Sequence, residues 1–538
     1  MNRYLLTALS VAGGILSGLA WTEWCPGLLL LLAFAPYFII ENHIYLNPRK
    51  FSMNSYFTFL LPGFVIFNTI ALSWVRAANI PAAIAVITEM SFLMSFVLWL
   101  AHVIRVKAGN TAGYTALITF WLAFEHLSLH SPYLSPWINL GNGLAKDILF
   151  IQWYEATGVA GGTLWILLSN LFLTLLITKN PGKRRIRIIY AAIWVAVIII
   201  PAVLSATRYL TIEKPDYRAS EVVIIQPDID PFSEKYTIPF EDQLNRALIM
   251  ARNNISDETD WLILPETIVD DPVNEADAAN DKYILALRDF AVKHKGLNII
   301  AGLVSYRVYP DAVKAPTRSA RKTNLSEYYA DHYNSAFNID ASDDPSIYHK
   351  SRLVPGIEMQ FSAILGKLTD KILPDMGGTI WGYGTQKTRT CFTHSVTGQK
   401  VAPVICYESV FGNFVADYVR EGAEALFVIT NDGWWKNTNG YFQHLTYSSL
   451  RAIETRRPVA RCANTGISCL IDIRGKRIQE TEWWTKSVLK GTIISGTKTT
   501  FYVRTGDYIY VMSSVISIMI LIYTFLYELK REKNNGLK

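Results

Sequence analysis

Three side chains capable of acid–base or nucleophilic chemistry lie directly after apolar runs in the second half of the sequence. Glu266 follows Leu-Ile-Leu-Pro, Lys350 follows Ile-Tyr-His, and Cys406 follows Val-Ile. Taken singly, such a glutamate is more often a cap, such a lysine is surface, and such a cysteine is a small core residue. Together they are more informative, because a carboxylate beside a thiol can take its proton and make it a nucleophile. The three residues are therefore candidates for cysteine-based catalysis.

The segments that must position these three residues alternate between short β-rich runs and helical runs. Alternation of this kind predicts an α/β domain with a buried sheet. We expect strands over 222–226, 261–264, 297–303, 335–339, 401–405, 425–430 and 458–463, and helices over 240–254, 279–295, 409–421 and 442–456.

The chain as a whole has the composition of a membrane protein. Of its 538 residues 51% are hydrophobic, and the mean hydropathy is +0.19. A helix needs roughly twenty apolar residues to cross a bilayer. We expect eight spans, near 4–20, 26–40, 54–74, 83–104, 112–129, 161–178, 187–206 and 508–527. The predicted organisation is a transmembrane bundle over 1–206 (about seven helices), a catalytic domain over 207–507, and a closing span with its tail over 508–538.

Basic residues near the span ends predict the orientation, because cytoplasmic loops carry an excess of Lys and Arg. With the N-terminus inside, the short outer loops hold only Arg76 and Lys146. The inner loops and tail hold Arg49, Lys50, Arg105, Lys107, Lys179, Lys183, Arg184, Arg185, Arg187, Lys530, Arg531, Lys533 and Lys538. This asymmetry predicts that the catalytic domain lies outside the cytoplasm.

Four polar residues fall inside predicted spans: Glu89, His102, Glu125 and His126. Such residues are candidates for function. Helix-to-helix hydrogen bonding is the alternative, and it is the one we favour.

The cysteines and histidines argue against several classes of site. Five cysteines are too few for a disulfide scaffold, although one bridge among Cys391, Cys462 and Cys469 stays open. No CxxC or HExxH motif supports a metal site. No basic stripe interleaved with aromatics supports binding of nucleic acid.

The order Glu266, Lys350, Cys406 resembles that of the nitrilase (carbon–nitrogen hydrolase) superfamily. The resemblance is closest to its membrane branch, the apolipoprotein N-acyltransferase family, and it covers nearly the whole chain. The motifs that carry it are Leu264-Pro-Glu266, Lys350-Ser-Arg-Leu-Val-Pro355, Cys406-Tyr-Glu408, Thr430-Asn-Asp-Gly-Trp-Trp435, Gln443-His444, Arg451-Ala-Ile-Glu454, Arg457-Pro458 and Ala463-Asn-Thr-Gly466.

The resemblance implies an αββα sandwich and specific roles. Glu266 would be the general base, Lys350 the oxyanion-stabilising lysine and Cys406 the nucleophile, with Glu358, Tyr407 and Glu408 supporting them. Two positions depart from the family pattern. Pro355-Gly-Ile-Glu358 replaces Pro-Phe-Gly-Glu, and Tyr236 takes the place of an aromatic that is often Trp.

The implied reaction is acyl transfer through a thioester on Cys406. The acyl donor would be a glycerophospholipid, phosphatidylethanolamine in particular, and the acceptor the α-amine of a lipoprotein's diacylglyceryl-cysteine. No diffusible cofactor is implied. The implied location is the bacterial inner membrane, with the catalytic domain on the periplasmic side.

Two questions stay open at the level of sequence. Trp434, Trp435, Tyr441 and Phe442 have the composition of a lipid-contacting lid and equally of an ordinary aromatic core. The alternative functions are a membrane-tethered amidase or nitrilase that uses water, and a non-catalytic membrane protein that binds lipoproteins. A transporter is disfavoured, because no pair of broken, repeated halves is evident.

Overall fold

The computed structural model describes residues 1–178, 184–213, 217–310, 313–322, 328–342, 344–355, 357–359 and 382–535. Contacts divide the chain into two units, one of residues 1–211 and 505–538 and one of residues 212–504. These boundaries lie within five residues of those expected from the sequence. Among the residues named above, Lys179, Lys183, Gly356 and Lys538 lie outside the described ranges.

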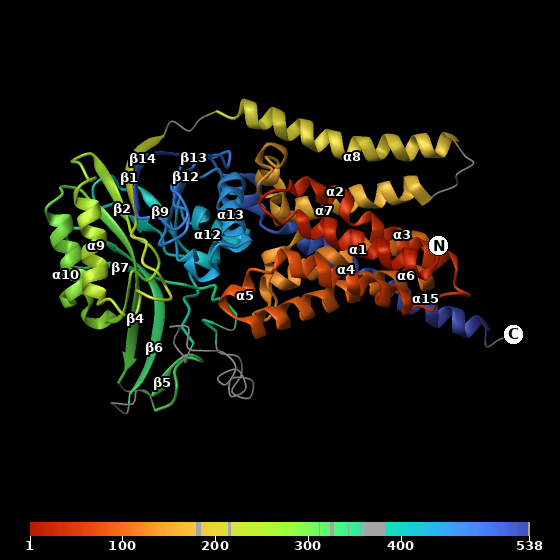
Figure 1. Ribbon diagram of the computed structural model, residues 1–538, viewed down its shortest axis with the longest axis horizontal. Helices are drawn as coiled ribbons and strands as arrows, with labels where there is room; N and C mark the ends of the chain where they lie inside the picture. The colour runs from red at the N-terminus through yellow and green to blue at the C-terminus, as the bar shows by residue number, and fades with distance from the viewer. Residues whose placement is uncertain are drawn as a thin grey trace. The chain divides into compact units, whose positions relative to one another are not determined.

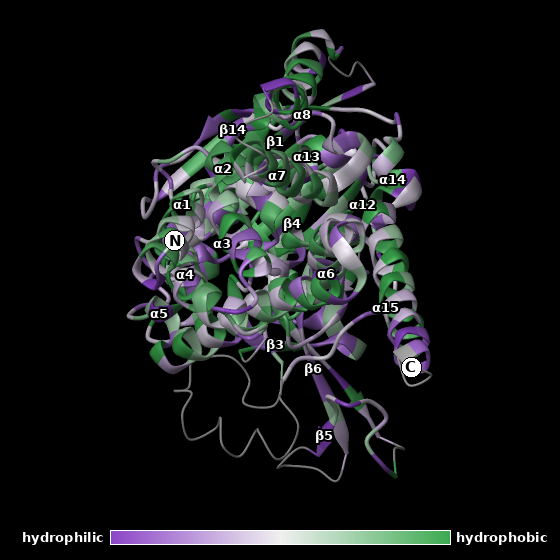
Figure 2. Ribbon diagram, turned by 90° about the vertical axis from the view of Figure 1, so that its right-hand side faces the viewer, coloured by the Kyte–Doolittle hydropathy of each residue, from purple (hydrophilic) through white to green (hydrophobic). Residues whose placement is uncertain are grey.

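The first unit is helical and largely apolar (Figures 1 and 2). Five of its described helical stretches are long and apolar enough to cross a membrane: Gly27–Leu46, Ile80–His130, Tyr154–Thr178, Arg184–Thr211 and Tyr508–Asn534. Two shorter apolar helices join them. The main helices are α1 (Arg3–Leu19), α3 (Ala35–Leu46), α4 (Ser55–Ala71), α6 (Ile80–His130), α7 (Tyr154–Thr178), α8 (Arg184–Thr211) and α15 (Tyr508–Asn535).

Helix α6 covers two of the spans expected from the sequence. Its backbone leaves the helical region at Gly109, where φ is +87°, a conformation open to glycine at little cost. A Cβ atom on Gly113 would come within 2.2 Å of Cβ of Arg105. Residues eight apart in a straight helix are about 12 Å apart, so the chain reverses at Gly109 and α6 consists of two limbs.

Both carboxylate oxygens of Glu125 in α6 accept two hydrogen bonds from other residues of this unit. Its Oε1 accepts from Nε1 of Trp121 (3.0 Å) and from the backbone N–H of Leu140 (2.7 Å). Its Oε2 accepts from Oγ1 of Thr163 in α7 (2.7 Å) and from the hydroxyl of Tyr510 in α15 (2.9 Å). The carboxylate therefore joins α6, α7 and α15, as expected for helix-to-helix bonding.

A second polar cluster joins α3 to α6. Nδ1 of His102 lies 2.7 Å from Oε1 of Glu41, and Arg105 forms an ion pair with the same carboxylate. Arg105 is buried within α6, four residues before the reversal at Gly109. Pairing with Glu41 offsets the cost of removing its charge from water. Of the other polar residues in the spans, His126 contacts Ser514, and Glu89 is exposed.

The second unit contains two β-sheets. The first has the order β14 (Ser487–Ser495), β1 (Arg218–Gln226), β2 (Thr259–Ile263), β4 (Asn298–Tyr309), β6 (Tyr329–Ile339) and β5 (Arg321–Lys322), with β3 (Val269–Asn274) beside β4 and β7 (Ser346–His349) beside β6. The second has the order β13 (Arg477–Glu480), β12 (Cys469–Ile471), β11 (Val459–Ala463), β10 (Ala425–Thr430), β9 (Lys400–Ile405) and β8 (Phe392–Thr393). The seven expected strands correspond to β1, β2, β4, β6, β9, β10 and β11.

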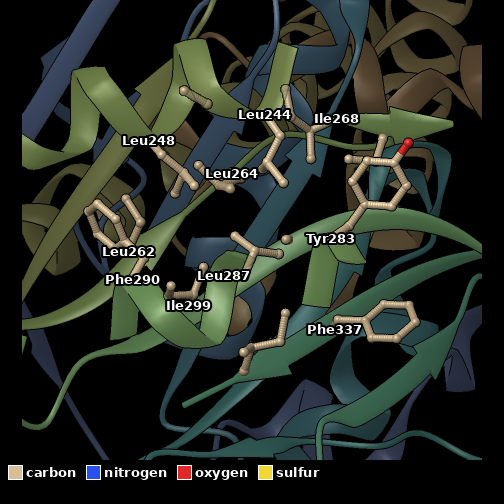
Figure 3. Close-up of a cluster of buried hydrophobic side chains, with 14 of the residues drawn as sticks. Leu244, Leu248, Leu262, Leu264, Ile268, Tyr283, Leu287, Phe290, Ile299 and Phe337 are labelled. Carbon is tan, nitrogen blue, oxygen red and sulfur yellow. The ribbon is translucent and has the colours of Figure 1, made fainter. Parts of the chain in front are cut away.

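Helices cover the outer faces of the two sheets (Figure 1). Helices α9 (Phe240–Arg252) and α10 (Lys282–Val292) pack on the first sheet, and α12 (Gly412–Arg420) and α13 (Asn439–Thr455) on the second. Figure 3 shows the core beneath α9 and α10, where Leu244, Leu248 and Leu287 meet Leu262 and Ile299 of the sheet. The domain is therefore an αββα sandwich, as the resemblance implies.

The central strands of each sheet run parallel. Strands β1, β2 and β4 are parallel neighbours in one sheet, and β9, β10 and β11 in the other. Polar residues that follow parallel strands gather at one edge of a sheet, which is where α/β proteins place their sites. We accordingly expect the site at the residues that follow β2, β9 and β10.

The five cysteines are free thiols in the structure. No bridge joins Cys391, Cys462 and Cys469, and the last two are buried within strands β11 and β12. The disulfide left open by the sequence is therefore not formed.

Candidate active site

Glu266 leaves β2 through a tight approach to the neighbouring strand β4. The backbone N–H of Gly302 donates to the carbonyl of Pro265 (3.2 Å), and its carbonyl accepts from Ile268 N–H (2.9 Å). A Cβ on Gly302 would lie 2.6 Å from Cα of Glu266, so only glycine fits there. The next residue, Thr267, has φ of +44°. This turn directs the Glu266 carboxylate into the interior, where it is 7% exposed.

Three donors hold that carboxylate. Oε1 accepts from Nζ of Lys350 (2.9 Å) and Nδ2 of Asn334 (2.8 Å), and Oε2 accepts from the backbone N–H of Asn431 (3.1 Å). Burial alone would raise the pKa of Glu266. The charge of Lys350 and the hydrogen bonds outweigh it, so the pKa lies below the ordinary value of a glutamate. Glu266 is therefore ionised at neutral pH.

Lys350 lies between two carboxylates. It follows β7, is 1% exposed, and donates from Nζ to Glu266 and to Oε1 of Glu358 (2.7 Å). Burial would lower the pKa of Lys350, but the two carboxylates raise it well above its ordinary value. Glu358 is itself held by Asn334 (3.1 Å) and by the backbone N–H of Val354 (2.8 Å). The ammonium is thus permanent and fixed in place.

Cys406 occupies a strained turn between β9 and the 3₁₀ helix η6 (Cys406–Val410). Its φ is +48°, a left-handed conformation that is uncommon for a residue with a side chain and typical of functional turns. Burial and the charge of Glu266 raise the pKa of the Cys406 thiol well above its ordinary value. The resting pair is therefore a protonated thiol beside an ionised Glu266, whose carboxylate it contacts.

Glu408 ties the turn of Cys406 to the segment that carries Lys350. Its Oε2 accepts from the backbone N–H of Ile405 (2.8 Å), and its Oε1 from the Ser351 N–H (2.7 Å) and the Tyr348 hydroxyl (2.6 Å). Burial raises the pKa of Glu408 to about 7. Its hydrogen bonds therefore join the end of β7 to the start of η6.

A buried polar group holds the backbone of Cys406 from the opposite side. Nε2 of His444 lies 3.0 Å from the Cys406 carbonyl oxygen, which also accepts from Oγ of Ser409 (2.8 Å). Nδ1 of His444 lies 2.9 Å from Oδ1 of Asp432, and Arg461 donates to the other oxygen of Asp432 (2.6 Å). A proton on Nε2 would allow His444 to donate to this carbonyl, which can only accept.

Sequence reasoning gave no role to Asn334, Asp432, His444 or Arg461. Asp432 and His444 lie inside motifs that carry the resemblance, and Asp432 follows β10 as Glu266 follows β2. Asn334 and Arg461 lie within strands and carry no motif signal of their own. Their contacts depend on strand pairing, which the sequence does not give.

The residues expected to bind substrate are dispersed. Tyr236 is half exposed, and its hydroxyl donates to Asp270 (2.9 Å). Trp434 packs edge-on to Phe232 and Trp435 edge-on to His444, at ring separations of 5.5 and 5.3 Å.

The other expected binding residues lie at the start of α13. Tyr441 stacks on Trp483 at 3.9 Å, and Phe442 beside it is partly buried. Tyr407 is nearly buried and packs edge-on to Phe411. Of the expected residues, Glu266, Lys350, Cys406 and Glu358 form one contiguous cluster.

The fold and this cluster define the class of protein. A family model described as "Carbon-nitrogen hydrolase" matches residues 222–500, more than half of the chain. The chain therefore belongs to the carbon–nitrogen hydrolase family. A second model, "Apolipoprotein N-acyltransferase N-terminal domain", matches residues 13–172.

Two relatives named apolipoprotein N-acyltransferase are similar along nearly their whole length. The protein of Chlorobaculum tepidum is 29% identical over 514 residues, covering 93% of this chain and 92% of that one. The protein of Geobacter metallireducens is 26% identical over 524 residues, covering 94% and 92%. Among solved structures, an amidase from Nesterenkonia matches 54% of this chain and 94% of its own, at 15% identity and a TM-score of 0.35.

Proposed function

We propose that this protein is an apolipoprotein N-acyltransferase that works through a thioester on Cys406. The observation that carries the proposal is the buried Glu266–Lys350–Cys406 cluster in a chain whose other unit is a bundle of apolar helices. The full-length similarity to relatives of that name supports the same activity.

The first half-reaction acylates Cys406. Glu266 takes the thiol proton as sulfur attacks the ester carbonyl of the donor, because the ionised carboxylate is the base in contact with the thiol. When the tetrahedral intermediate collapses, the carbon–oxygen bond of the donor breaks and Glu266 returns the proton to the leaving alkoxide. The products are an acyl-enzyme and a lysophospholipid.

Negative charge develops on the carbonyl oxygen in this step. The fixed ammonium of Lys350 and the backbone N–H of Tyr407 are the groups proposed to stabilise it. A preorganised donor of this kind is worth about a hundredfold or more in rate. Glu358 acts by holding Lys350 in place, and Glu408 by holding the turn of Cys406.

The second half-reaction transfers the acyl group to an amine. The free α-amine of the acceptor attacks the thioester, Glu266 removes a proton from nitrogen, and the thiolate leaves and is reprotonated. The product is an amide, and Cys406 is again a thiol. A reaction of this order is ping-pong, with the acyl-enzyme as the intermediate between two substrates.

The proposed donor is a membrane glycerophospholipid, phosphatidylethanolamine in particular, and the proposed acceptor is the diacylglyceryl-cysteine of a lipoprotein. Eight spans in the bacterial inner membrane, with the catalytic domain on the periplasmic side, fit the distribution of basic residues. Tyr236, Trp434, Trp435, Tyr441 and Phe442 are the aromatic side chains proposed to contact the substrates.

The amidase alternative uses the same nucleophile with water as acceptor. It leaves the apolar helices and the similarity to the acyltransferase N-terminal domain without a role. Burial of a long acyl chain gains roughly 0.8 kcal/mol per methylene, which suits a lipid donor.

The test is mass spectrometry of the intact protein in detergent after incubation with phosphatidylethanolamine, followed by a diacylated lipopeptide. The wild type is expected to gain one acyl mass, which then moves to the α-amine of the peptide. Cys406→Ala gains none. Cys391→Ala, which removes another free thiol of the same unit, serves as the matched control and behaves as wild type.

Two outcomes would contradict the proposal. An acyl mass that is lost to water at the same rate with and without the lipopeptide favours the amidase. Full lipopeptide acylation by Cys406→Ala would remove Cys406 from the chemistry.

A further inference from the structure

Two arginines lie over the same aromatic ring on α12. Cζ of Arg389 is 3.8 Å from the ring centroid of Phe414, and Cζ of Arg352 is 5.5 Å from it. Arg352 also lies over Phe411, at 4.9 Å. Stacking on aromatic faces holds a guanidinium plane while leaving its N–H edge available for hydrogen bonding.

Neither guanidinium forms an ion pair with a carboxylate anywhere in the described residues. Arg389 donates only to neutral oxygens, the Tyr348 hydroxyl (3.2 Å) and the carbonyl of Lys387 (2.9 Å). Burial and the charge of Arg389 lower the pKa of Arg352. Two partly buried cations close together repel each other unless an anion joins them.

The pair is close to the nucleophile. Arg352 is two residues beyond Lys350, and the ring of Phe411 beneath it packs against Tyr407, the residue after Cys406 (5.2 Å between centroids). On the other side, the Tyr348 hydroxyl that accepts from Arg389 donates to Glu408 (2.6 Å). Two contacts therefore separate each guanidinium from the turn of Cys406.

We propose that Arg352 and Arg389 bind the phosphodiester of the acyl donor. The inference rests on the proposed function and adds to it the part of the donor that these residues recognise. An arginine fork matches two oxygens of a phosphate, and two forks can share one phosphate. In a glycerophospholipid the phosphate is a few bonds from the ester carbonyl that Cys406 attacks, so both groups can be held at once.

In this proposal Arg352 and Arg389 bind the donor, and other residues carry out the acyl transfer. The arginines bind a group that does not react, so they raise the affinity for any donor with a phosphodiester. They do not contact the ester carbonyl, so the acylation step at saturation does not depend on them. The recognised feature is the phosphate, and neither the ethanolamine nor the acyl chain.

The test uses the full-length protein in detergent micelles with two donors of identical acyl chains, phosphatidylethanolamine and 1,2-diacylglycerol. The rate of acyl-enzyme formation is measured against the mole fraction of donor. Arg352→Gln and Arg389→Gln are each expected to raise the half-saturating fraction of phosphatidylethanolamine about tenfold, as loss of a charge-assisted contact does. Their values for diacylglycerol, which lacks the phosphate, stay those of wild type.

Three further variants or donors make the result specific. Arg352→Lys keeps the charge but loses the fork, so an intermediate value is expected. Arg218→Gln is the matched control, because Arg218 also lies over a ring, that of Tyr217, and is paired with Glu424. Phosphatidylglycerol, another phosphodiester, responds to the variants as phosphatidylethanolamine does.

The proposal is overturned if the variants slow acylation by both donors equally, or if the half-saturating fraction of phosphatidylethanolamine does not change. A variant that melts well below wild type is judged by its ratio between the two donors, which a general folding defect leaves unchanged. Failure of the proposed function is distinct: the wild type then takes an acyl group from neither donor.

Discussion

At the scale of single residues, the site widens the difference in pKa that already exists in water between a glutamate carboxyl and a cysteine thiol. Burial holds the proton on Cys406, while Lys350 and Asn334 keep Glu266 without one. In the proposed reaction we therefore expect the proton to move only when sulfur attacks, so that the thiol is unreactive between turnovers.

We expect the lowered pKa of Glu266 to set the pH below which the rate of acyl-enzyme formation falls. Glu266 must be ionised to act as base, so acyl-enzyme formation in the wild type is expected to persist as pH falls to the ordinary glutamate range near 4.5. Asn334→Ala removes a hydrogen bond that favours the charged form, which raises the pKa of Glu266 and moves the acid limb to higher pH. The measurement is the rate of acylation by an uncharged ester between pH 4 and 8. An unmoved acid limb would mean that another group controls it.

Replacement of His444 is also expected to change the rate of acylation. This side chain holds the carbonyl of Cys406, and the N–H of Tyr407 belongs to the same peptide unit, so His444 orients the proposed oxyanion donor without touching substrate. His444→Ala is expected to slow acylation about tenfold to a hundredfold with little change in the half-saturating donor fraction. His444→Gln retains a donor near Nε2 and recovers part of the rate. Equal loss in both variants would point to a purely structural role.

Particular residues show how far the sequence could predict this site. Glu266, Lys350 and Cys406 are predictable because each follows an apolar strand in a recognisable motif. Asn334 is not, because it reaches Glu266 only through the pairing of β6 with β4. The sequence also left open whether Tyr441 belongs to a lid or to an aromatic core, since its stacking on Trp483 depends on residues 42 positions apart meeting in space. The end of a strand can be predicted from a short stretch of sequence. The partner of a side chain on another strand cannot, because it depends on how the strands pair.

At the scale of elements, the close approach of β2 and β4 sets the position of the base. Backbone atoms of residues 265–267 surround the place where a Cβ of residue 302 would be. Backbone cannot move aside as a side chain can, so the strand end and the carboxylate move together.

Gly302→Ala is therefore expected to displace Glu266 and to lower the rate of acylation by about a hundredfold, with a clear loss of thermal stability. Gly491→Ala is the control, because its Cβ would meet the movable side-chain ends of Gln479 and Leu470. Intact-protein mass spectrometry and thermal melting measure the two effects. A Gly302→Ala variant with wild-type acylation would show that the strand end tolerates the added methyl group.

At the scale of the whole molecule, the two units are stabilised by different means. The sandwich has an apolar core between helices and sheets (Figure 3). The helical unit relies in part on buried polar hubs, of which Glu125 is the most connected: one carboxylate accepts from four donors on three helices and a loop.

Glu125→Ala is expected to destabilise the helical unit by about 3 to 5 kcal/mol, because four buried donors lose their acceptor. Tyr510→Phe removes one donor only and costs about 1 kcal/mol. Thermal melting of the full-length protein in detergent, followed by helical circular dichroism, measures both. Equal melting temperatures for wild type and Glu125→Ala would mean that water or lipid replaces the carboxylate at no cost.

The cluster of Lys350 between Glu266 and Glu358 has a consequence for which amines can be acylated. One cation and two anions leave the buried site electrically unbalanced by one negative charge. An amine acceptor whose carboxyl is already an amide adds no negative charge to this site, whereas a free amino acid brings a carboxylate that increases the imbalance. We therefore expect the site to accept the first residue of a polypeptide, whose carboxyl is already an amide, more readily than a free amino acid.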